Sequence, residues 1–213
     1  MHFEILVEDL SGKKALDILI QKIVGAHHTF NIYPYRGIGH IPKNLNNPTN
    51  ANTHLLLNQL PMQLRAYGKS YTNDPTKVVI VVCDLDNNCL KTFRQELFRV
   101  LNSCNPKPET RFCIAIEEGE AWLLGDIPAI KAVYPKAKDN ILNDYQNDSI
   151  CGTWELPADA IFVGGSNALG KKPWYVIGKE KSVWAQKITP YMNVDKNASP
   201  SFCYFRDKIR EMI

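Results

Sequence analysis

Short apolar runs alternate with amphipathic stretches along the first 126 residues of the chain. The runs are Phe3–Val7, the segment TFNIYPY at 29–35, Val78–Cys83 and Arg111–Ile116. The third run is uniformly apolar and mostly β-branched, which is typical of a buried strand. The pattern therefore predicts four strands.

The stretches between these runs predict helices. Two of them repeat apolar residues with the spacing of one helix face: Leu16, Leu19, Ile20 and Ile23, then Leu90, Phe93, Leu97 and Leu101. Ser11 is the expected N-cap of the first helix. A polar loop at 36–52 leads to a predicted helix at Leu55–Tyr67 with Pro61 in its middle, and EEGEAWLLGD at 117–126 predicts a further helix.

Strand and helix alternate through Asp126, which predicts an α/β fold with a mostly parallel sheet flanked by helices. Beyond Asp126 the alternation ends, and residues 127–178 carry four prolines and the Gly-rich segment VGGSNALGKKP. Helices are expected near Lys179–Ile188 and Ser201–Met212. Because no linker is visible, we expect one compact domain: an α/β core over 1–126 and an α-rich C-terminal extension over 127–213 packed on it.

Composition and charge indicate the kind of protein but not its activity. The net charge of +3 permits contact with nucleic acid without arguing for it. The sequence has no signal peptide and no run of about eighteen apolar residues. None of its six cysteines forms a C-x-x-C pair. These features predict a cytoplasmic protein with reduced thiols.

Acidic residues follow three of the four predicted strands. Glu8 and Asp9 follow the first strand, and Asp84 and Asp86 follow the third. Three acids follow the fourth strand: Glu117, Glu118 and Glu120. The carboxyl ends of parallel strands meet at one edge of a sheet, where ligands gather. Asp84 and Asp86 share a face if the chain stays extended. Glu120 lies on a helical stripe with Leu123 and Leu124, so it is expected to point inward, and Glu117 is placed on the same side.

Converging carboxylates repel each other, so a proton, a basic partner or a cation must relieve them. Oxygen ligands suit Mg²⁺ or Mn²⁺. The expected ligand set, which is also the expected catalytic set, is Glu8, Asp84, Asp86 and Glu120. Each acid also has a structural alternative. For Glu8 it is a helix cap, for the two aspartates it is a turn, and for Glu120 it is an ion pair with a buried Arg or Lys.

Basic and aromatic residues supply candidates for contact with a substrate. Arg36, at the end of the second strand, is a candidate phosphate ligand or an ion-pair partner for one of the acids. Lys171 and Lys172 are candidates for stabilising a phosphate, and Lys172 is the one we expect at the site. The alternative is that both lysines lie in a solvated loop. The tryptophans at 154, 174 and 184 offer stacking surfaces for bases, although core packing is the favoured role.

The motifs resemble the Toprim domain, in which one strand ends in Glu and a later strand ends in Asp-x-Asp. Here Glu8 lies in ILVEDLSG, and Asp84 and Asp86 lie in VVCDLDNN. Four further blocks resemble small stand-alone Toprim-like proteins related to overcoming-lysogenisation-defect nucleases: PYRGIGHIPKNL, VIVVCDLDNNCLKTFRQEL, FCIAIEEGEAWLLGD and SPSFCYFRDKIREM. The family pattern often has Gly where this chain has Asp9.

This resemblance implies a Toprim-like, Rossmann-like core and a Mg²⁺- or Mn²⁺-dependent nuclease acting on DNA or RNA. It also implies an ATPase partner in anti-phage defence or DNA maintenance. Two alternatives stand beside it. One is a catalytically silent Toprim fold that serves as a binding or regulatory subunit. The other is a haloacid-dehalogenase-like phosphatase with Asp84 as the nucleophile, although the order of its motifs differs from that of this chain.

Overall fold

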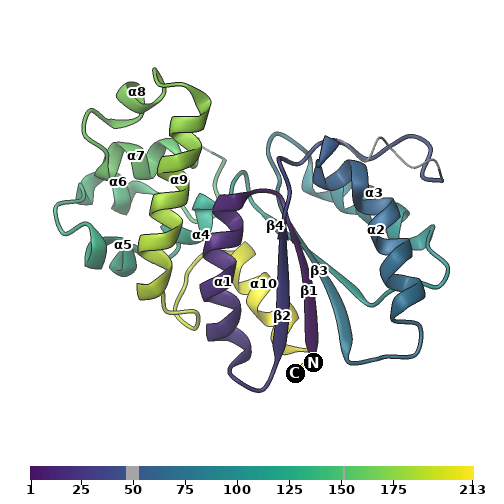
Figure 1. Cartoon of the computed structure of the whole chain (residues 1–213). Helices are drawn as coiled ribbons and strands as arrows, with labels where there is room; N and C mark the ends of the chain where they lie inside the picture. Colours follow the sequence, from purple (N-terminus) through teal and green to yellow (C-terminus); the bar gives the residue numbers. More distant parts are fainter. Residues whose placement is uncertain (47–52, 151) are drawn as a thin grey trace.

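Four parallel strands form the centre of the molecule, which a computed structural model describes over residues 1–46, 53–150 and 152–213 (Figure 1). The strands are β1 (His2–Val7), β2 (Thr29–Pro34), β3 (Lys77–Asp84) and β4 (Thr110–Ala115), in the spatial order β2-β1-β3-β4. This confirms the predicted α/β class and its parallel sheet. Residues 47–52 of the expected polar loop and Cys151, one of the expected thiols, lie outside the described residues.

Three helices connect the strands: α1 (Leu10–Val24), α2 (Leu56–Ser70, with Pro61 inside it) and α3 (Leu90–Asn102). β1 lies between β2 and β3, so the chain moves to one side of β1 and then crosses to the other. Val7 pairs with Pro34 and Val82, and Asp84 pairs with Ala115. The carboxyl ends of β1 and β3 are therefore neighbours at a reversal of strand order, which is where open α/β sheets bind ligands.

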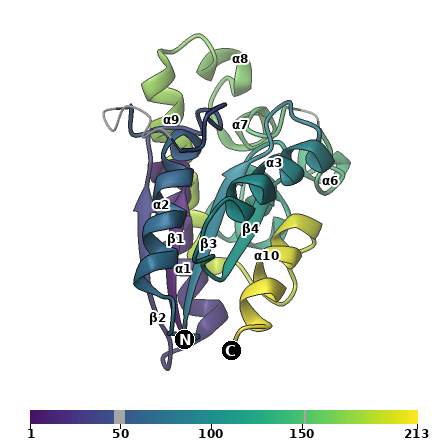
Figure 2. The ribbon, with the colours of Figure 1, turned by 90° about the vertical axis from the view of Figure 1, so that its right-hand side faces the viewer.

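The two faces of the sheet are covered by different helices (Figures 1 and 2). One apolar cluster joins α2 and α3 to the alternate strand residues Leu6, Val79 and Val81. The other joins Ile5 and Ile80 to α1 and to the C-terminal region. Alternation of the strand side chains sends each set to its own face. β1, β3 and β4 are therefore buried on both faces, whereas the edge strand β2 is exposed or partly exposed.

The C-terminal region consists of helices with a single apolar core shared with the sheet. They are α4 (Glu120–Leu124), α5 (Ile127–Val133), α6 (Asp139–Asp144), α7 (Glu155–Ile161), α8 (Gly165–Leu169), α9 (Trp174–Ile188), the 3₁₀ turn η2 (Thr189–Tyr191) and α10 (Pro200–Arg210). α9 begins five residues before the predicted Lys179. It lies beside α1, and α10 lies against β4.

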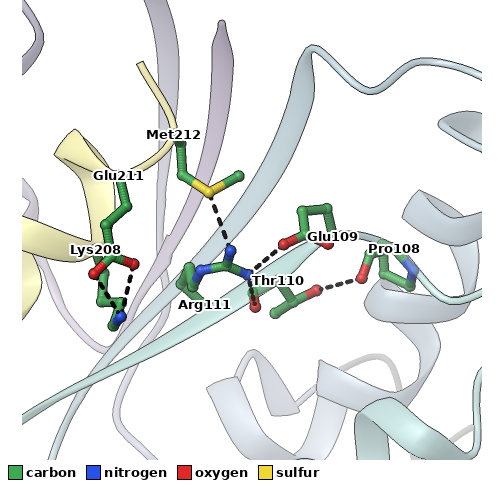
Figure 3. A network of polar contacts seen from close by, with 7 residues as sticks. All are labelled: Pro108, Glu109, Thr110, Arg111, Lys208, Glu211 and Met212. Atoms are coloured by element: carbon green, nitrogen blue, oxygen red, sulfur yellow. Dashed lines mark hydrogen bonds and ion pairs between the residues drawn. The ribbon is translucent and has the colours of Figure 1, made fainter.

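The last residues of the chain are held near the start of β4. Figure 3 shows the Arg111 guanidinium, which contacts Glu109 and donates to the Met212 Sδ at 3.1 Å. α10 also contacts α4: Phe205 stacks on the Trp122 ring with centroids 4.8 Å apart, and the Trp122 Nε1 donates to the Ser201 hydroxyl at 3.0 Å. These contacts tie the extension to the sheet.

Two details of the helix predictions are wrong. Asp9, not Ser11, is the N-cap of α1: its Oδ1 accepts from the Gly12 amide at 2.7 Å, and the Ser11 hydroxyl donates to its Oδ2 at 2.6 Å. Gly12 is needed there, because an added Cβ would lie 2.7 Å from the Val7 Cγ2. In α3, Leu90 is exposed at the first turn, while Val100 joins Phe93, Leu97 and Leu101 in the core.

Two findings bear on the environment of the chain. Among the residues that the structure describes, no helix combines the length and the apolar character that crossing a bilayer requires. The five cysteines within these residues are free thiols, and Cys83 and Cys113 are buried on adjacent strands.

Candidate functional site

The ends of β1 and β3 bring Glu8 and Asp84 together. The strands are paired residue by residue up to Val7 and Val82, so the next residues emerge at the same edge. The Asp84 backbone amide donates to the Glu8 Oε2 at 3.2 Å. Glu8 and Asp84, which are 76 residues apart in the sequence, are thus in direct contact, as the strand-end pattern predicts.

A small pocket of about 60 Å³ opens at this junction. Its charged lining comes from four acids and one base: Glu8, Asp9, Asp84, Glu120 and Lys181. Its remaining walls are largely apolar side chains of β1, α1, α4 and α9. Gly119 also belongs to the wall, and a Cβ added there would lie 3.7 Å from the Asp84 Oδ1. This volume exceeds the roughly 10–15 Å³ that one water molecule requires. The pocket therefore has room for a small ion and part of its hydration.

Burial makes the two strand-end acids poor anions. Burial raises the pKa of Glu8 to about 7, with a contribution from the negative charges of Asp86 and Asp9, while the hydrogen bond from the Asp84 amide and the charge of Lys181 oppose the shift. Burial also raises the pKa of Asp84 well above its ordinary value, and repulsion by Glu8 adds to this. Both groups favour a proton or a cation over a pair of free negative charges.

Lys181 on α9 supplies the one positive charge in the lining of this pocket. Its Nζ lies 3.1 Å from the Glu120 Oε2 and 3.5 Å from the Glu118 Oε2. Burial lowers the pKa of Lys181, but attraction to Glu120, Glu118 and Asp84 outweighs burial and raises it. The ammonium therefore stays charged inside the protein.

Lys181 was not among the residues expected at the site. Its signal was present in the predicted helix, because Trp184, Ala185 and Ile188 follow it at the i+3, i+4 and i+7 positions and are buried. A lysine on the apolar face of a helix needs a buried anion as its partner. The sequence does not show which anion that is.

Glu120 is buried, with 5% of its surface exposed, as the helical stripe predicted. It lines the pocket and pairs with Lys181, so the structure realises the alternative in which Glu120 partners a buried base. Glu118 shares that lysine, and burial raises its pKa to about 7.

Asp86 does not lie beside Asp84 in the way an extended chain would place it. Its φ of +48° turns the chain after Leu85, and its amide donates to the Glu117 carbonyl at 2.9 Å. Asp86 is outside the pocket lining, although its charge still acts on Glu8. Burial raises the pKa of Asp86, and Lys181 opposes that shift.

Glu117 turns away from the pocket as well. It has a φ of +60°, and its carboxylate accepts from the Gly152 amide at 3.0 Å and the Thr153 amide at 3.1 Å. The Thr153 hydroxyl donates to the same carboxylate. The expectation that Glu117 lies on the Glu120 side is therefore wrong, because this carboxylate anchors the loop before α7.

The basic candidates lie outside the pocket lining, and Arg36 is the one whose neighbour in sequence contacts Glu8. Arg36 is exposed where β2 ends, and the amide of the next residue, Gly37, donates to the Glu8 carbonyl at 3.0 Å. Gly37 has a φ of +114°, which favours glycine. Lys171 and Lys172 are exposed between α8 and α9, outside the pocket lining.

The donor set can be compared with the needs of a divalent ion. Within the described residues, no group of three or more His, Cys, Asp or Glu side chains converges to hold a metal. The pair Glu8 and Asp84 offers carboxylate oxygens alone. Mg²⁺ usually takes one or two carboxylates and fills its remaining positions with water and phosphate oxygens. The pair fits such an ion, while Glu120 is paired with Lys181 and Asp86 lies outside the pocket lining.

Comparisons with known proteins do not indicate a family for this chain. The chain matches no protein-family model, no curated protein and no solved structure.

Proposed function

We propose that this protein is a Toprim-like, divalent-metal-dependent nuclease whose centre is the pair Glu8 and Asp84. The observation that supports the proposal most strongly is the meeting of these two partly buried acids at the junction of β1 and β3. Burial raises the pKa of each carboxyl group, and the pocket beside them has room for an ion. Acids with shifted pKa values in a cleft are candidates for a functional site.

Glu8 and Asp84 would hold Mg²⁺ or Mn²⁺, which would activate water and stabilise the charge that develops on a phosphodiester. The protein's own groups then divide the remaining work. Glu8 would bind the ion or, as a base beside it, accept a proton from the attacking water. The Lys181 ammonium offsets the negative charge of the pocket, and Arg36 where β2 ends can bind a neighbouring phosphate.

A direct test measures nicking of a supercoiled plasmid by protein freed of metal with EDTA, before and after addition of Mn²⁺ or Mg²⁺. We expect cleavage only with metal, and a loss of about 10²-fold or more in Asp84→Asn. Asp17→Asn is the matched control, because Asp17 is exposed and pairs only with Lys13 on α1. Metal-dependent cleavage by Asp84→Asn at the wild-type rate would end the proposal.

A second candidate is a catalytically silent Toprim fold that acts as a binding or regulatory subunit. It is favoured by Lys181, which already neutralises part of the acidic cluster. It predicts no metal-dependent cleavage by the wild-type protein, together with stable association with a partner. The ATPase partner and a role in anti-phage defence or DNA maintenance remain predictions from the resemblance, and co-purification tests the first of them.

A further inference from the structure

Four tryptophans in this protein have very different surroundings. Trp122 and Trp184 are buried in the core, and Trp154 is partly buried against it. Trp174 has 84% of its surface exposed, so the expected packing role is wrong for this residue. An isolated exposed apolar side chain needs no explanation, but this one has exposed apolar neighbours.

Trp174 belongs to a group of exposed residues between α8 and the first turn of α9 that we name the α8–α9 apex: Lys171, Lys172, Trp174 and Tyr175. Tyr175 is 62% exposed. The two aromatic rings meet edge to face with centroids 6.3 Å apart. The apex thus presents preformed aromatic surface to the solvent.

Backbone hydrogen bonds hold the apex in shape. The Lys172 amide donates to the Leu169 carbonyl at 2.9 Å, and the Val176 amide donates to the Pro173 carbonyl at 2.8 Å. Pro173 also fixes the start of α9 directly before Trp174. A rigid aromatic platform loses little conformational freedom when it binds a ligand.

The charge of the apex is entirely positive. Residues 163–179 contain three lysines, at 171, 172 and 179, and no acidic residue. These three charges equal the net charge of +3 of the whole chain, so the other residues are balanced. An anionic ligand with a flat apolar surface is complementary to this combination, and a nucleotide has both features.

The apex is also aligned with the pocket. Trp174 and Lys181 are seven residues apart on α9, which at about 100° per residue places them on the same helix face. The rise of about 1.5 Å per residue separates them by about 10 Å along the axis. Figure 1 shows the N-terminal end of α9, with α8, extending beyond the carboxyl ends of the strands.

We propose that the α8–α9 apex binds an unpaired nucleotide of the substrate, with Trp174 stacking on its base and Lys171 and Lys172 binding the flanking phosphates. The placement next to the reacting phosphate rests on the proposed nuclease function. Stacking requires a base outside a duplex, so the apex selects single-stranded or locally unpaired nucleic acid. The alignment with the pocket favours this ligand over an anionic membrane surface, which similar side chains also bind.

The test measures binding in EDTA, so that it does not depend on cleavage. The probe is a short fluorescent oligothymidylate, titrated at two salt concentrations and compared with a duplex of the same length. We expect Trp174→Ala to weaken single-strand binding about 5- to 150-fold, and Trp174→Phe to retain most of it. Removing both lysines, in Lys171→Ala/Lys172→Ala, should lower the salt slope by about 1.4.

Tyr191→Ala is the matched control, because Tyr191 is an exposed aromatic residue beyond the opposite end of α9 and should bind like the wild type. Equal affinity of Trp174→Ala and wild type would overturn the inference. So would Trp174-dependent binding to phosphatidylserine vesicles without binding to the oligonucleotide. Trp174-dependent binding by a protein that never cleaves would support the apex and contradict only the nuclease function. If Trp174→Ala changes neither nicking nor binding, the result would support the nuclease function and contradict the apex.

Discussion

Two pairs of acids meet at the carboxyl edge of the sheet, and the protein treats them differently. Glu118 and Glu120 share the Lys181 ammonium within 3.5 Å. Glu8 and Asp84 line the same pocket, and the hydrogen bond between them comes from a neutral backbone amide. Lys181 attracts both of them, but its ion pairs are with Glu118 and Glu120. Partly buried acids without a base in contact are suited to an added cation. This contrast is the basis for placing the proposed metal site at Glu8 and Asp84.

The largest expected difference between the two pairs is in cleavage. Glu8→Gln should lower the rate of metal-dependent nicking by about 10²-fold or more, because it removes an ion ligand and a proton acceptor. Glu118→Gln, on the Lys181 side, should retain most of the activity. Plasmid nicking at saturating Mn²⁺ measures both. A reversed order of the two variants would show that the pairs have been assigned the wrong roles.

Lys181→Met should have the largest effect on stability. It leaves the buried Glu120 and the partly buried Glu118 without a base. We expect a loss in the free energy of unfolding of up to about 3–5 kcal/mol, the cost of a fully buried unpaired charge. Urea denaturation at neutral pH measures this. Lys187→Met is the control, because Lys187 is exposed on the same helix. Adding Glu120→Gln to Lys181→Met should restore part of the loss, and failure to do so would place the lysine's main partner elsewhere.

Bound Mn²⁺ should stabilise the protein through Glu8 and Asp84, and not through Glu118 and Glu120. A ligand present at 100 times its dissociation constant adds about 2.7 kcal/mol to the free energy of unfolding. Thermal melts with and without Mn²⁺ should therefore show a rise in the melting temperature of the wild type and of Glu118→Gln, and no rise in Asp84→Asn. A shift that survives in Asp84→Asn would place the ion outside the proposed pair.

The smallest expected effect concerns pH. The pKa of Glu8 rises from an ordinary value of 4.5 to about 7 in the folded protein, so the folded state keeps a proton that the unfolded state releases between these values. The free energy of unfolding should therefore fall as pH rises from about 4.5 to about 7, by at most about 1.4 kcal/mol per pH unit for one proton.

Without metal, Glu8→Gln should have a shallower slope than the wild type across this range. Glu118 has a similarly raised pKa and contributes a slope of its own, so some dependence should remain. Denaturation midpoints at several pH values measure the slopes. An unchanged slope in Glu8→Gln would show that the Glu8 carboxyl titrates normally.

The sequence predicts the sheet well because burial on both faces leaves a strong local pattern. Val78–Cys83 is short, uniformly apolar and mostly β-branched, which favours an interior strand. The meeting of Glu8 and Asp84 follows from it, since parallel strands share their carboxyl edge. Local patterns fail where competing choices are nearly equal. Asp9 and Ser11 are both good N-caps, and the packing of Gly12 against Val7 decides between them.

The remaining features of the site depend on tertiary structure. Asp86 leaves the pocket because its backbone adopts a left-handed conformation that aspartate tolerates, and an Asp-x-Asp motif does not reveal this. Lys181 reaches the acids only because α9 packs beside α1, and nothing in the sequence near Glu120 indicates that contact. Trp174 is exposed for the converse reason, since α9 begins where its neighbours no longer cover it.

Diffraction from a Mn²⁺-soaked crystal, with anomalous data, tests most directly whether the pair Glu8 and Asp84 binds a divalent cation. We expect one strong anomalous peak in the pocket, with carboxylate oxygens of both residues about 2.1 Å from the ion. Lys181 should remain on Glu118 and Glu120. A pocket without manganese at saturating concentration, or an ion held by Glu118 and Glu120 in place of Lys181, would contradict the assignment.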